Sequence, residues 1–285
     1  MTAHFNTAAI VGVGLLGGSL GLALKARRMA DRVYGIGRRQ ESLDTALKLG
    51  AVDKTFLDLS EGIRGADLIV LCTPAALVAG QLDTIASLCD PSAVVTDVAS
   101  TKAEICAHAR ATWRQPLRFV GSHPMAGSEK YGPEHATDRL YENCVTLVEC
   151  ANGHAADAHE VVCGLWKGVG ARVVEIDPAV HDALVARSSH IPHIASSLVA
   201  SLAGNLGDIR STVGKGFRDV TRVAGGRPEI WRDICLTNRE AISEGLAELA
   251  KRLDAVRAMI AESDGNSLDA FFAEAQLARK KALGE

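Results

Sequence analysis

The chain has 285 residues, with 31 lysines and arginines against 34 aspartates and glutamates, and its formal net charge at pH 7 is -3. This balance gives no basic surplus that would hold a polyanion, so nucleic acid is not an expected partner. The length and the hydrophobic content of 47% suffice for about two domains with a sizeable core. The first residues lack the basic start and apolar run of a signal peptide, and no apolar stretch reaches the roughly 18 residues of a membrane span. We therefore expect a cytoplasmic protein that does not enter a membrane.

The seven cysteines are spread along the chain, without a Cys-x-x-Cys pair and without Cys/His spacing typical of zinc. Their odd number does not suit a complete disulfide framework. They are interpreted as reduced, mostly buried thiols, and no metal ion is expected.

The first part of the chain alternates short, β-rich apolar runs with segments of helical character. This alternation predicts a parallel sheet with crossover helices. Beyond Pro178 the strand-like alternation ends and apolar residues recur at helical spacing, so the rest is predicted to be all-α. The expected domains are residues 1–178 and 179–285. The predicted strands are 8–11, 33–36, 68–72, 94–98, 119–120, 144–149 and 172–176.

The helical domain is predicted to hold an apolar stretch at 181–202, interrupted by Pro192, a helix from about 228 to about 260, and a final helix from about 267 to about 282. The middle helix is much longer than the average globular helix of about 11 or 12 residues. Pairing across a two-fold axis would bury its apolar face, so we expect a homodimer formed mainly by this domain. A closed monomeric bundle is the alternative.

Directly after the first predicted strand comes the turn Gly12-Val13-Gly14-Leu15-Leu16-Gly17. In such a turn the first glycine allows a tight bend, the second lets the backbone approach a pyrophosphate, and the third lets the helix pack closely on the strand. The helix that begins at Leu15 and Leu16 would offer free amide groups and the positive end of its dipole to the phosphates. The order of strand, glycines and helix predicts a Rossmann-type dinucleotide-binding domain.

The end of the second predicted strand indicates which cofactor the domain prefers. A chain that binds NAD would carry an acidic residue there to hold the ribose hydroxyls. This chain has Gly37, Arg38 and Arg39 instead. Two guanidinium groups can bind a 2′-phosphate with charge-assisted hydrogen bonds, which favours NADP while leaving the use of NAD open. The alternative is that both arginines are solvated residues of a surface turn.

In a sheet of this kind the chemistry takes place beyond the carboxyl ends of the strands, where successive loops converge. The loops after three of the predicted strands carry Thr73 and Pro74, Ser100, and His123. A neutral histidine at such a place can act as a base near neutral pH. The structural alternatives are a strand-end role for His123 and a helix N-cap role for Ser100.

Several further motifs follow one another across nearly the whole chain. They are GVGLLGGS at 12–19, DVASTK at 97–102, GSHPMAGSE at 121–129, SSHIPH at 188–193, GFRDVTR at 216–222 and EIW at 229–231. In these segments the chain resembles the prephenate/arogenate dehydrogenase (cyclohexadienyl dehydrogenase) family of tyrosine biosynthesis. The resemblance implies NAD(P)-dependent oxidative decarboxylation of prephenate to 4-hydroxyphenylpyruvate, of arogenate to tyrosine, or of both.

The resemblance also implies roles for single residues. His123 matches the family's base, and Ser100 matches the serine that hydrogen-bonds near the substrate hydroxyl and the histidine. Arg222 matches the arginine that would hold a substrate carboxylate in a planar two-point contact. Arg218 and Asp219 would position it, although a solvated ion pair between them at a helix end explains both residues equally well.

The segment with His190 and His193 lines the family's site near the substrate side chain and the nicotinamide; buried core histidines are the alternative. Glu129 matches a family position at the entrance of the pocket, but the simpler interpretation is that Glu129 is an ordinary surface carboxylate. Trp231 is interpreted as core or dimer packing, and His181 is assigned no chemistry, as are the other histidines outside the motifs.

The sequence leaves prephenate and arogenate open as substrates, because they differ only at the side chain. NADP preference leans slightly towards arogenate by analogy. The final helix is expected to end close to Glu285, which leaves no room in this sequence for a chorismate mutase segment or a regulatory domain. The alternatives are a β-hydroxyacid dehydrogenase, whose catalytic lysine the histidine motifs do not suit, and a nicotinamide-sensing protein without catalysis.

Overall fold

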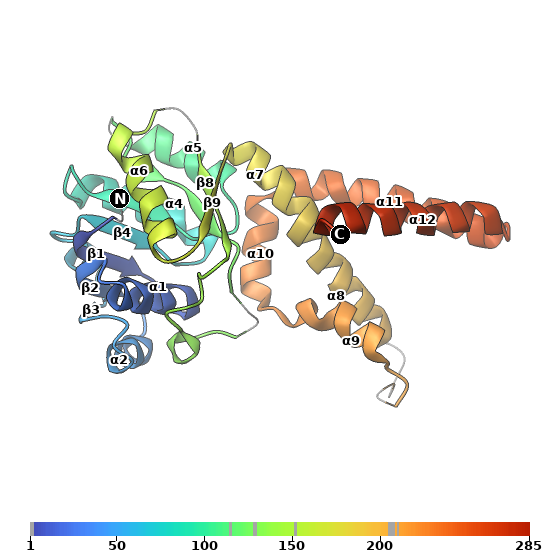
Figure 1. The fold of residues 1–285 in the computed structure, drawn as a ribbon, viewed down its shortest axis with the longest axis horizontal. Helices are drawn as coiled ribbons and strands as arrows, with labels where there is room; N and C mark the ends of the chain where they lie inside the picture. Colours follow the sequence, from blue (N-terminus) through green and yellow to red (C-terminus); the bar gives the residue numbers. More distant parts are fainter. Residues whose placement is uncertain (1–2, 114–115, 128–129, 151–152, 205–208, 210) are drawn as a thin grey trace. The chain divides into compact units, whose positions relative to one another are not determined.

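A computed structural model describes residues 3–113, 116–127, 130–150, 153–204, 209 and 211–285 (Figure 1). The chain forms two compact units, Met1–Arg239 and Glu240–Glu285. Within the described residues, no helix is both long and apolar enough to cross a membrane.

The first unit is built on a parallel sheet, in which the described strands follow the order β3-β2-β1-β4-β5-β6. This order places β1 and β4 side by side at the centre, as in other doubly wound dinucleotide-binding sheets. The strands are β1 (Phe5–Val11), β2 (Ala30–Ile36), β3 (Lys54–Phe56), β4 (Leu68–Leu71), β5 (Val94–Asp97) and β6 (Phe119–Val120).

Helices cover both faces of this sheet, because each central strand is apolar on both sides. In β1, Ala8 and Ile10 pack into one hydrophobic cluster, while Ala9 and Val11 pack into another. The first cluster includes residues of α1 (Leu15–Ala26), α2 (Gln40–Lys48) and α6 (Ala156–Gly168). The second includes residues of α3 (Leu59–Gly62), α4 (Ala75–Leu88) and α5 (Ala103–Thr112).

Each predicted strand range contains a strand. The expectation of a single parallel sheet is wrong, however, because the strands after Gly121 do not join the first sheet. The strands β7 (Ser122–Pro124), β8 (Val145–Glu149) and β9 (Arg172–Ile176) form a second sheet, in which β7 and β8 are antiparallel. Parallel neighbours need a crossover of a dozen or more residues, and Gly121 alone separates β6 from β7. The chain therefore leaves the first sheet at Gly121. The sequence did not indicate β3 and β7, which are three residues each.

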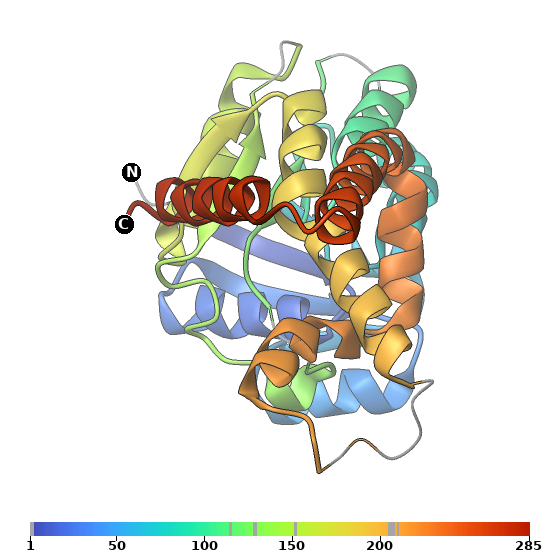
Figure 2. The same cartoon turned by 90° about the vertical axis from the view of Figure 1, so that its right-hand side faces the viewer.

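The helical part of the first unit begins with a rod that continues through Pro192 (Figures 1 and 2). The rod consists of α7 (Pro178–Val185), the π-helical turn η2 (Ala186–His190) and α8 (Ile191–Gly204). The predicted interruption at Pro192 is wrong, because proline lies in the first turn of α8, where its missing amide hydrogen is tolerated, directly after the wider π turn.

The long helix predicted from about 228 to about 260 is two helices, α10 (Pro228–Thr237) and α11 (Arg239–Ala261). Asn238 between them has φ -124° and ψ 35°, outside the helical region. Its side chain makes hydrogen bonds to Asp182 and His190, which fix this break. Before α10 lie α9 (Lys215–Thr221) and the 3-10 turn η3 (Arg222–Gly225).

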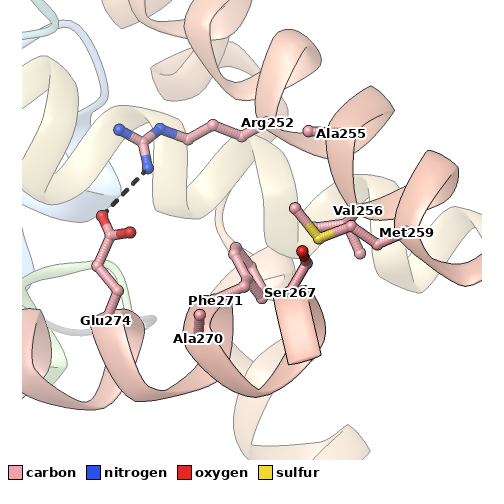
Figure 3. A pocket seen from close by; sticks show the side chains of 8 residues that line it. All are labelled: Arg252, Ala255, Val256, Met259, Ser267, Ala270, Phe271 and Glu274. Carbon is pink, nitrogen blue, oxygen red and sulfur yellow. Dashed lines mark ion pairs between the residues drawn. The ribbon is translucent and has the colours of Figure 1, made fainter. Parts of the chain in front are cut away.

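The second unit consists of the rest of α11 and of α12 (Gly265–Leu283), which agrees with the predicted final helix. The Asp264 side chain accepts a hydrogen bond from the Ser267 amide and caps α12. A pocket lies between the two helices, and across it Arg252 pairs with Glu274 at 3.8 Å (Figure 3). None of the predicted site residues lines this pocket.

Candidate active site

The glycine turn after β1 has the geometry of an anion cradle. Gly12 has φ +100°, and a Cβ at this residue would lie 2.6 Å from the carbonyl oxygen of Cys72. A Cβ at Gly17 would clash with the carbonyl of Gly12, so helix and strand are packed as closely as the motif requires. By contrast, a Cβ at Gly14 would meet no atom within 4 Å. Space is therefore open beside the residue that should face the pyrophosphate.

No side chain competes with an anion for the free backbone amides at the start of α1. Gly14 is its N-cap residue, no side chain caps the helix, and its first turn holds no acidic residue. The first amide groups, from Leu15 and Leu16 onward, are therefore available to phosphate oxygens, next to the positive end of the helix dipole. The residues present fit a nicotinamide dinucleotide.

The two other predicted cofactor segments lie at the same edge of the sheet. Thr73 adjoins the glycine turn, because its Cγ2 atom would lie 3.1 Å from a Cβ at Gly12, and its hydroxyl donates to Gln81 at 2.6 Å. Pro74 is the N-cap residue of α4. After β2, Arg38 and Arg39 are exposed, and no carboxylate among the described residues pairs with either guanidinium group.

His123 lies at the centre of β7, opposite Leu147 of β8, and it is 8% exposed. Its neighbour Ser122 is anchored deeply: the Ser122 amide donates to Asp97 Oδ1 at 3.0 Å, and its hydroxyl donates to the Asp97 carbonyl at 2.6 Å. The imidazole position is therefore set by the strand and not by a loop, contrary to the sequence interpretation.

The imidazole of His123 is neutral at pH 7. Burial, followed by the positive charges that His181, Lys102 and His190 can carry, holds its pKa well below the usual 6.5. Lys102 is buried and ion-paired with Asp97. Burial raises the pKa of Asp97, and the neighbouring lysine offsets only part of that rise. A neutral histidine with no charge of its own can accept a proton.

The structure brings to His123 a residue pair that the sequence analysis missed. The Nδ1 atom of His123 lies 3.0 Å from Nε2 of His181, and Nδ1 of His181 lies 2.7 Å from Oδ1 of Asp182. All three side chains are buried. His123 and His181 are 58 residues apart in the chain, and the His181-Asp182 dipeptide belongs to no motif, so no sequence signal pointed to it.

Ser100 is half-buried in the loop between β5 and α5. Its proposed alternative role as a helix N-cap is not seen, because Lys102 is the N-cap residue of α5. The first amides of that helix, those of Lys102 and Ala103, donate instead to the carboxylate of Asp182 at 2.8 and 2.9 Å.

His190 and His193 are both buried, and each has a ring nitrogen without a hydrogen-bond partner among the described residues. These atoms are Nε2 of His190 and Nδ1 of His193. The Trp231 indole stacks on the His193 ring. It meets the His190 ring edge-on, with 6.2 Å between the centroids of Trp231 and His190. Trp231 thus packs against these two buried histidines.

Arg218 and Arg222 are exposed, on α9 and at the start of η3. The Ser196 hydroxyl donates to the Val220 carbonyl at 2.8 Å, which packs their segment against α8, the helix that carries His193. Among the described residues, no carboxylate pairs with either guanidinium group, so the suggested Arg218–Asp219 ion pair is not seen. Ser128 and Glu129 lie outside the described residues.

In the described part of the chain, His159, Cys163 and Glu175 each offer a possible metal-ligand atom, and these atoms lie within 4.8 Å of one another. Glu175 is exposed, and burial raises the pKa of the Cys163 thiol to about 11, which keeps it protonated. These residues touch none of the site residues above, and we assign them no metal.

The buried histidines should make the fold sensitive to acid. Burial lowers the pKa of His190 from 6.5 to about 4. Its contribution to stability is then fully present above pH 6.5 and is lost as the pH falls towards 4, because the unfolded chain binds the proton first. The loss should approach about 3 kcal/mol for this group at about 1.36 kcal/mol per pKa unit. Urea unfolding from neutral pH down to about pH 4 measures it.

The matched control is His135, an exposed histidine at the end of η1 (Pro133–His135). His190→Gln should flatten the pH dependence of the unfolding free energy, whereas His135→Gln should leave it unchanged. Equal slopes for all three proteins would contradict the assignment.

Parallel sheet, glycine turn and buried histidine together define a class: a nicotinamide-dinucleotide-dependent dehydrogenase with a helical C-terminal region. Two family models match the chain. "Prephenate dehydrogenase, nucleotide-binding domain" matches residues 20–175, and "Prephenate dehydrogenase, dimerization domain" matches residues 177–274. The chain therefore belongs to the prephenate dehydrogenase family.

Individual proteins are similar over almost the whole chain. The prephenate dehydrogenase of Bacillus subtilis (strain 168) is 34% identical over 95% of this chain and 74% of its own length. The crystal structure of prephenate dehydrogenase from A. aeolicus, in complex with hydroxyphenyl propionate and NAD+, is 27% identical, with a TM-score of 0.90 over 97% of this chain and 98% of that one. Synechocystis arogenate dehydrogenase is 28% identical, with a TM-score of 0.81 over 97% and 99%.

Proposed function

We propose that this chain catalyses the NAD(P)-dependent oxidative decarboxylation of prephenate, of arogenate or of both, with His123 as the base. The observation that carries the proposal is a buried, neutral histidine at the same edge of the fold as an uncapped glycine turn that fits a dinucleotide. The membership of the prephenate dehydrogenase family supports it.

The reaction needs a base that is uncharged before it accepts the proton. His123 would accept the 4-hydroxyl proton as that carbon is oxidised to a carbonyl. A bound nicotinamide supplies the hydride acceptor. When the ring carboxylate leaves as carbon dioxide, the electron pair of the broken bond passes through the ring to oxygen, and the proton on His123 returns to it. Ser100 would hydrogen-bond near this hydroxyl.

The remaining site residues are proposed to hold the substrate. Arg222 would bind a carboxylate through its two-point guanidinium contact, and Arg218 would position it. Both are exposed and without a partner carboxylate in the described chain, so neither is committed to a structural ion pair. The unpaired ring nitrogens of His190 and His193 would be completed by substrate or nicotinamide polar atoms.

The cofactor preference follows from charge, and we propose NADP over NAD. The exposed Arg38 and Arg39, with Gly37 before them, leave positive charge where a 2′-phosphate would lie. We expect the double variant Arg38→Ala/Arg39→Ala to lose at least about 100-fold in kcat/KM for NADP, since hydrogen bonds to charged groups contribute about 1.5 to 3 kcal/mol each and the variant removes two such donors.

The same variant should change kcat/KM for NAD by less than about threefold, because NAD carries no group there. Arg32→Ala, which removes an exposed arginine from β2, is the matched control and should change neither constant. Equal losses for both cofactors, or none for NADP, would contradict the assignment of the arginine pair.

We propose residues 1–178 as the cofactor domain and 179–285 as the helical substrate and dimerisation domain of a homodimer. The match of residues 177–274 to a dimerization domain supports this, and so does the apolar surface of the second unit. Its exposed large apolar residues include Leu253, Ile260, Phe272, Leu277 and Leu283.

The direct test is the initial rate of nicotinamide reduction, followed by absorbance, with prephenate or arogenate against NAD or NADP. Turnover with either substrate supports the proposal, and the faster substrate decides between them. Turnover with NAD alone would remove the NADP preference and keep the reaction. No turnover in any combination, with cofactor binding intact, would favour a nicotinamide-sensing protein and overturn the proposed function.

A further inference from the structure

Three buried side chains form a hydrogen-bonded chain that ends on the proposed base. Asp182, His181 and His123 are 4%, 0% and 8% exposed. Nδ1 of His181 lies 2.7 Å from Oδ1 of Asp182, and Nε2 of His181 lies 3.0 Å from Nδ1 of His123. Each ring nitrogen between the carboxylate and His123 therefore has a protein partner.

The chemistry of the partners decides where the hydrogens are. A carboxylate can only accept, so Nδ1 of His181 carries its hydrogen. Burial lowers the pKa of His181, which keeps the ring neutral and leaves Nε2 with a lone pair. Nδ1 of His123 must then donate to it. In a neutral ring this leaves the lone pair of His123 on Nε2, the nitrogen that has no partner in this chain of contacts.

Asp182 itself is held in one orientation by the start of α5. Its Oδ1 atom accepts from the Lys102 amide at 2.8 Å, and its Oδ2 atom accepts from the Ala103 amide at 2.9 Å. These two donors come from a helix N-terminus, where a negative charge is favoured. The carboxylate thus caps a helix and orients His181 at the same time.

The backbone carbonyl of Asp182 orients a second histidine, His190, through Asn238, and here the histidine Nδ1 atom is the acceptor. The side-chain amide nitrogen of Asn238 donates to the Asp182 carbonyl at 2.9 Å and lies 3.2 Å from Nδ1 of His190. A carbonyl can only accept, so this atom of Asn238 is the NH2 group, and its second hydrogen points to the Nδ1 lone pair of His190. The hydrogen of neutral His190 is then on Nε2, which is buried without a partner in the described chain.

We propose that Asp182 is a positioning residue that sets opposite tautomers in two histidines: a bare Nε2 on His123, and a hydrogen-bearing Nε2 on His190. The first suits a base, and the second suits a donor to a carbonyl or carboxylate oxygen of the bound substrate. The role assigned to the bare nitrogen of His123 rests on the proposed function. The tautomers themselves do not, because they follow from hydrogen bonds within the chain.

Nitrogen-15 NMR of the full chain with labelled histidine tests the tautomers directly, because protonated and bare ring nitrogens have distinct shifts and couplings. We expect a bare Nε2 on His123 and a bare Nδ1 on His190 near neutral pH. Asn238→Ala should alter the His190 signals and leave those of His123. A bare Nδ1 on His123, or a bare Nε2 on His190, would overturn the corresponding half of the proposal.

Kinetics of two variants at His181 provide a readout that a purely structural role would not give. His181→Gln keeps an amide oxygen that can accept from His123, whereas His181→Leu removes the acceptor and leaves both tautomers of His123 accessible. We expect kcat to fall by about 100-fold or more in the leucine variant, in the range of general-base effects, and by less than about tenfold in the glutamine variant.

Equal kcat values for these two variants, at equal stability to urea, would overturn the role of His181. The outcome stays separable from the function itself. Turnover that survives His123→Asn would refute the base assignment while the NMR tautomers still stand, whereas the wrong tautomers in an active enzyme would refute only the positioning role.

Discussion

Replacing His123 by asparagine is expected to lower kcat by about 10²- to 10⁴-fold, the usual contribution of a positioned base. The reason is that this imidazole is buried and its pKa lies well below 6.5, so it is the neutral acceptor available at pH 7. Asparagine keeps a polar side chain of similar size but cannot take a proton. The initial rate at saturating substrate and cofactor measures the effect.

The dissociation constant of the cofactor, measured by fluorescence, should remain within about threefold of the wild-type value, because the glycine turn does not involve this strand. His135→Asn, at an exposed histidine, is the matched control and should leave both quantities unchanged. Turnover that survives His123→Asn with normal cofactor binding would show that another group accepts the proton.

The second large effect is expected at the glycine turn, where two neighbouring glycines should respond in different ways. Gly12→Ala should destabilise the fold by about 2 to 4 kcal/mol, within the range of strained backbone and steric overlap. Its φ of +100° disfavours a side chain, and a Cβ would lie 2.6 Å from the carbonyl oxygen of Cys72. Urea unfolding measures the loss.

Gly14→Ala should leave the unfolding free energy within about 1 kcal/mol, because the φ of -83° is ordinary and a Cβ would meet no atom within 4 Å. It should nevertheless weaken cofactor binding by at least about tenfold, since the new methyl group occupies the space that the pyrophosphate needs. Titration with NADP and NAD measures the affinity.

Gly80→Ala, in the interior of α4 with equally open surroundings, is the control for adding a methyl group. It should stabilise the fold by up to about 1 kcal/mol through helix propensity and leave cofactor binding unchanged. If Gly14→Ala binds both cofactors normally, the open space beside Gly14 is not the pyrophosphate site.

The sequence indicated the cofactor domain well because its signals are local. An apolar run needs only its own residues to show that it will be buried on both faces, and Gly12, Gly14 and Gly17 follow β1 in the order that the turn requires. The errors occurred where neighbours in space overrode local pattern. Apolar spacing runs through Asn238, but its side-chain bonds to Asp182 and His190 fix a break between α10 and α11.

The placement of His123 shows the same limit within the site. Its motif was visible, and the loop in which it was expected is a strand, because Gly121 leaves too few residues for another parallel crossover. The strand fixes the backbone of His123, which pairs with Leu147 of β8 and directly follows the anchored Ser122. Local sequence named the residue, and pairing with β8 determined its environment.

What the sequence determined by itself was the class of fold, the glycine turn, the charge at the end of β2 and the chemical types of the site residues. Each of these is written in consecutive residues. What the tertiary structure alone decided was which polar side chains are hydrogen-bonded to one another. His181 reaches His123 across 58 residues, and Asp182 acts on His123 through His181; these contacts depend on the packing of α7 against α5, which no local pattern encodes.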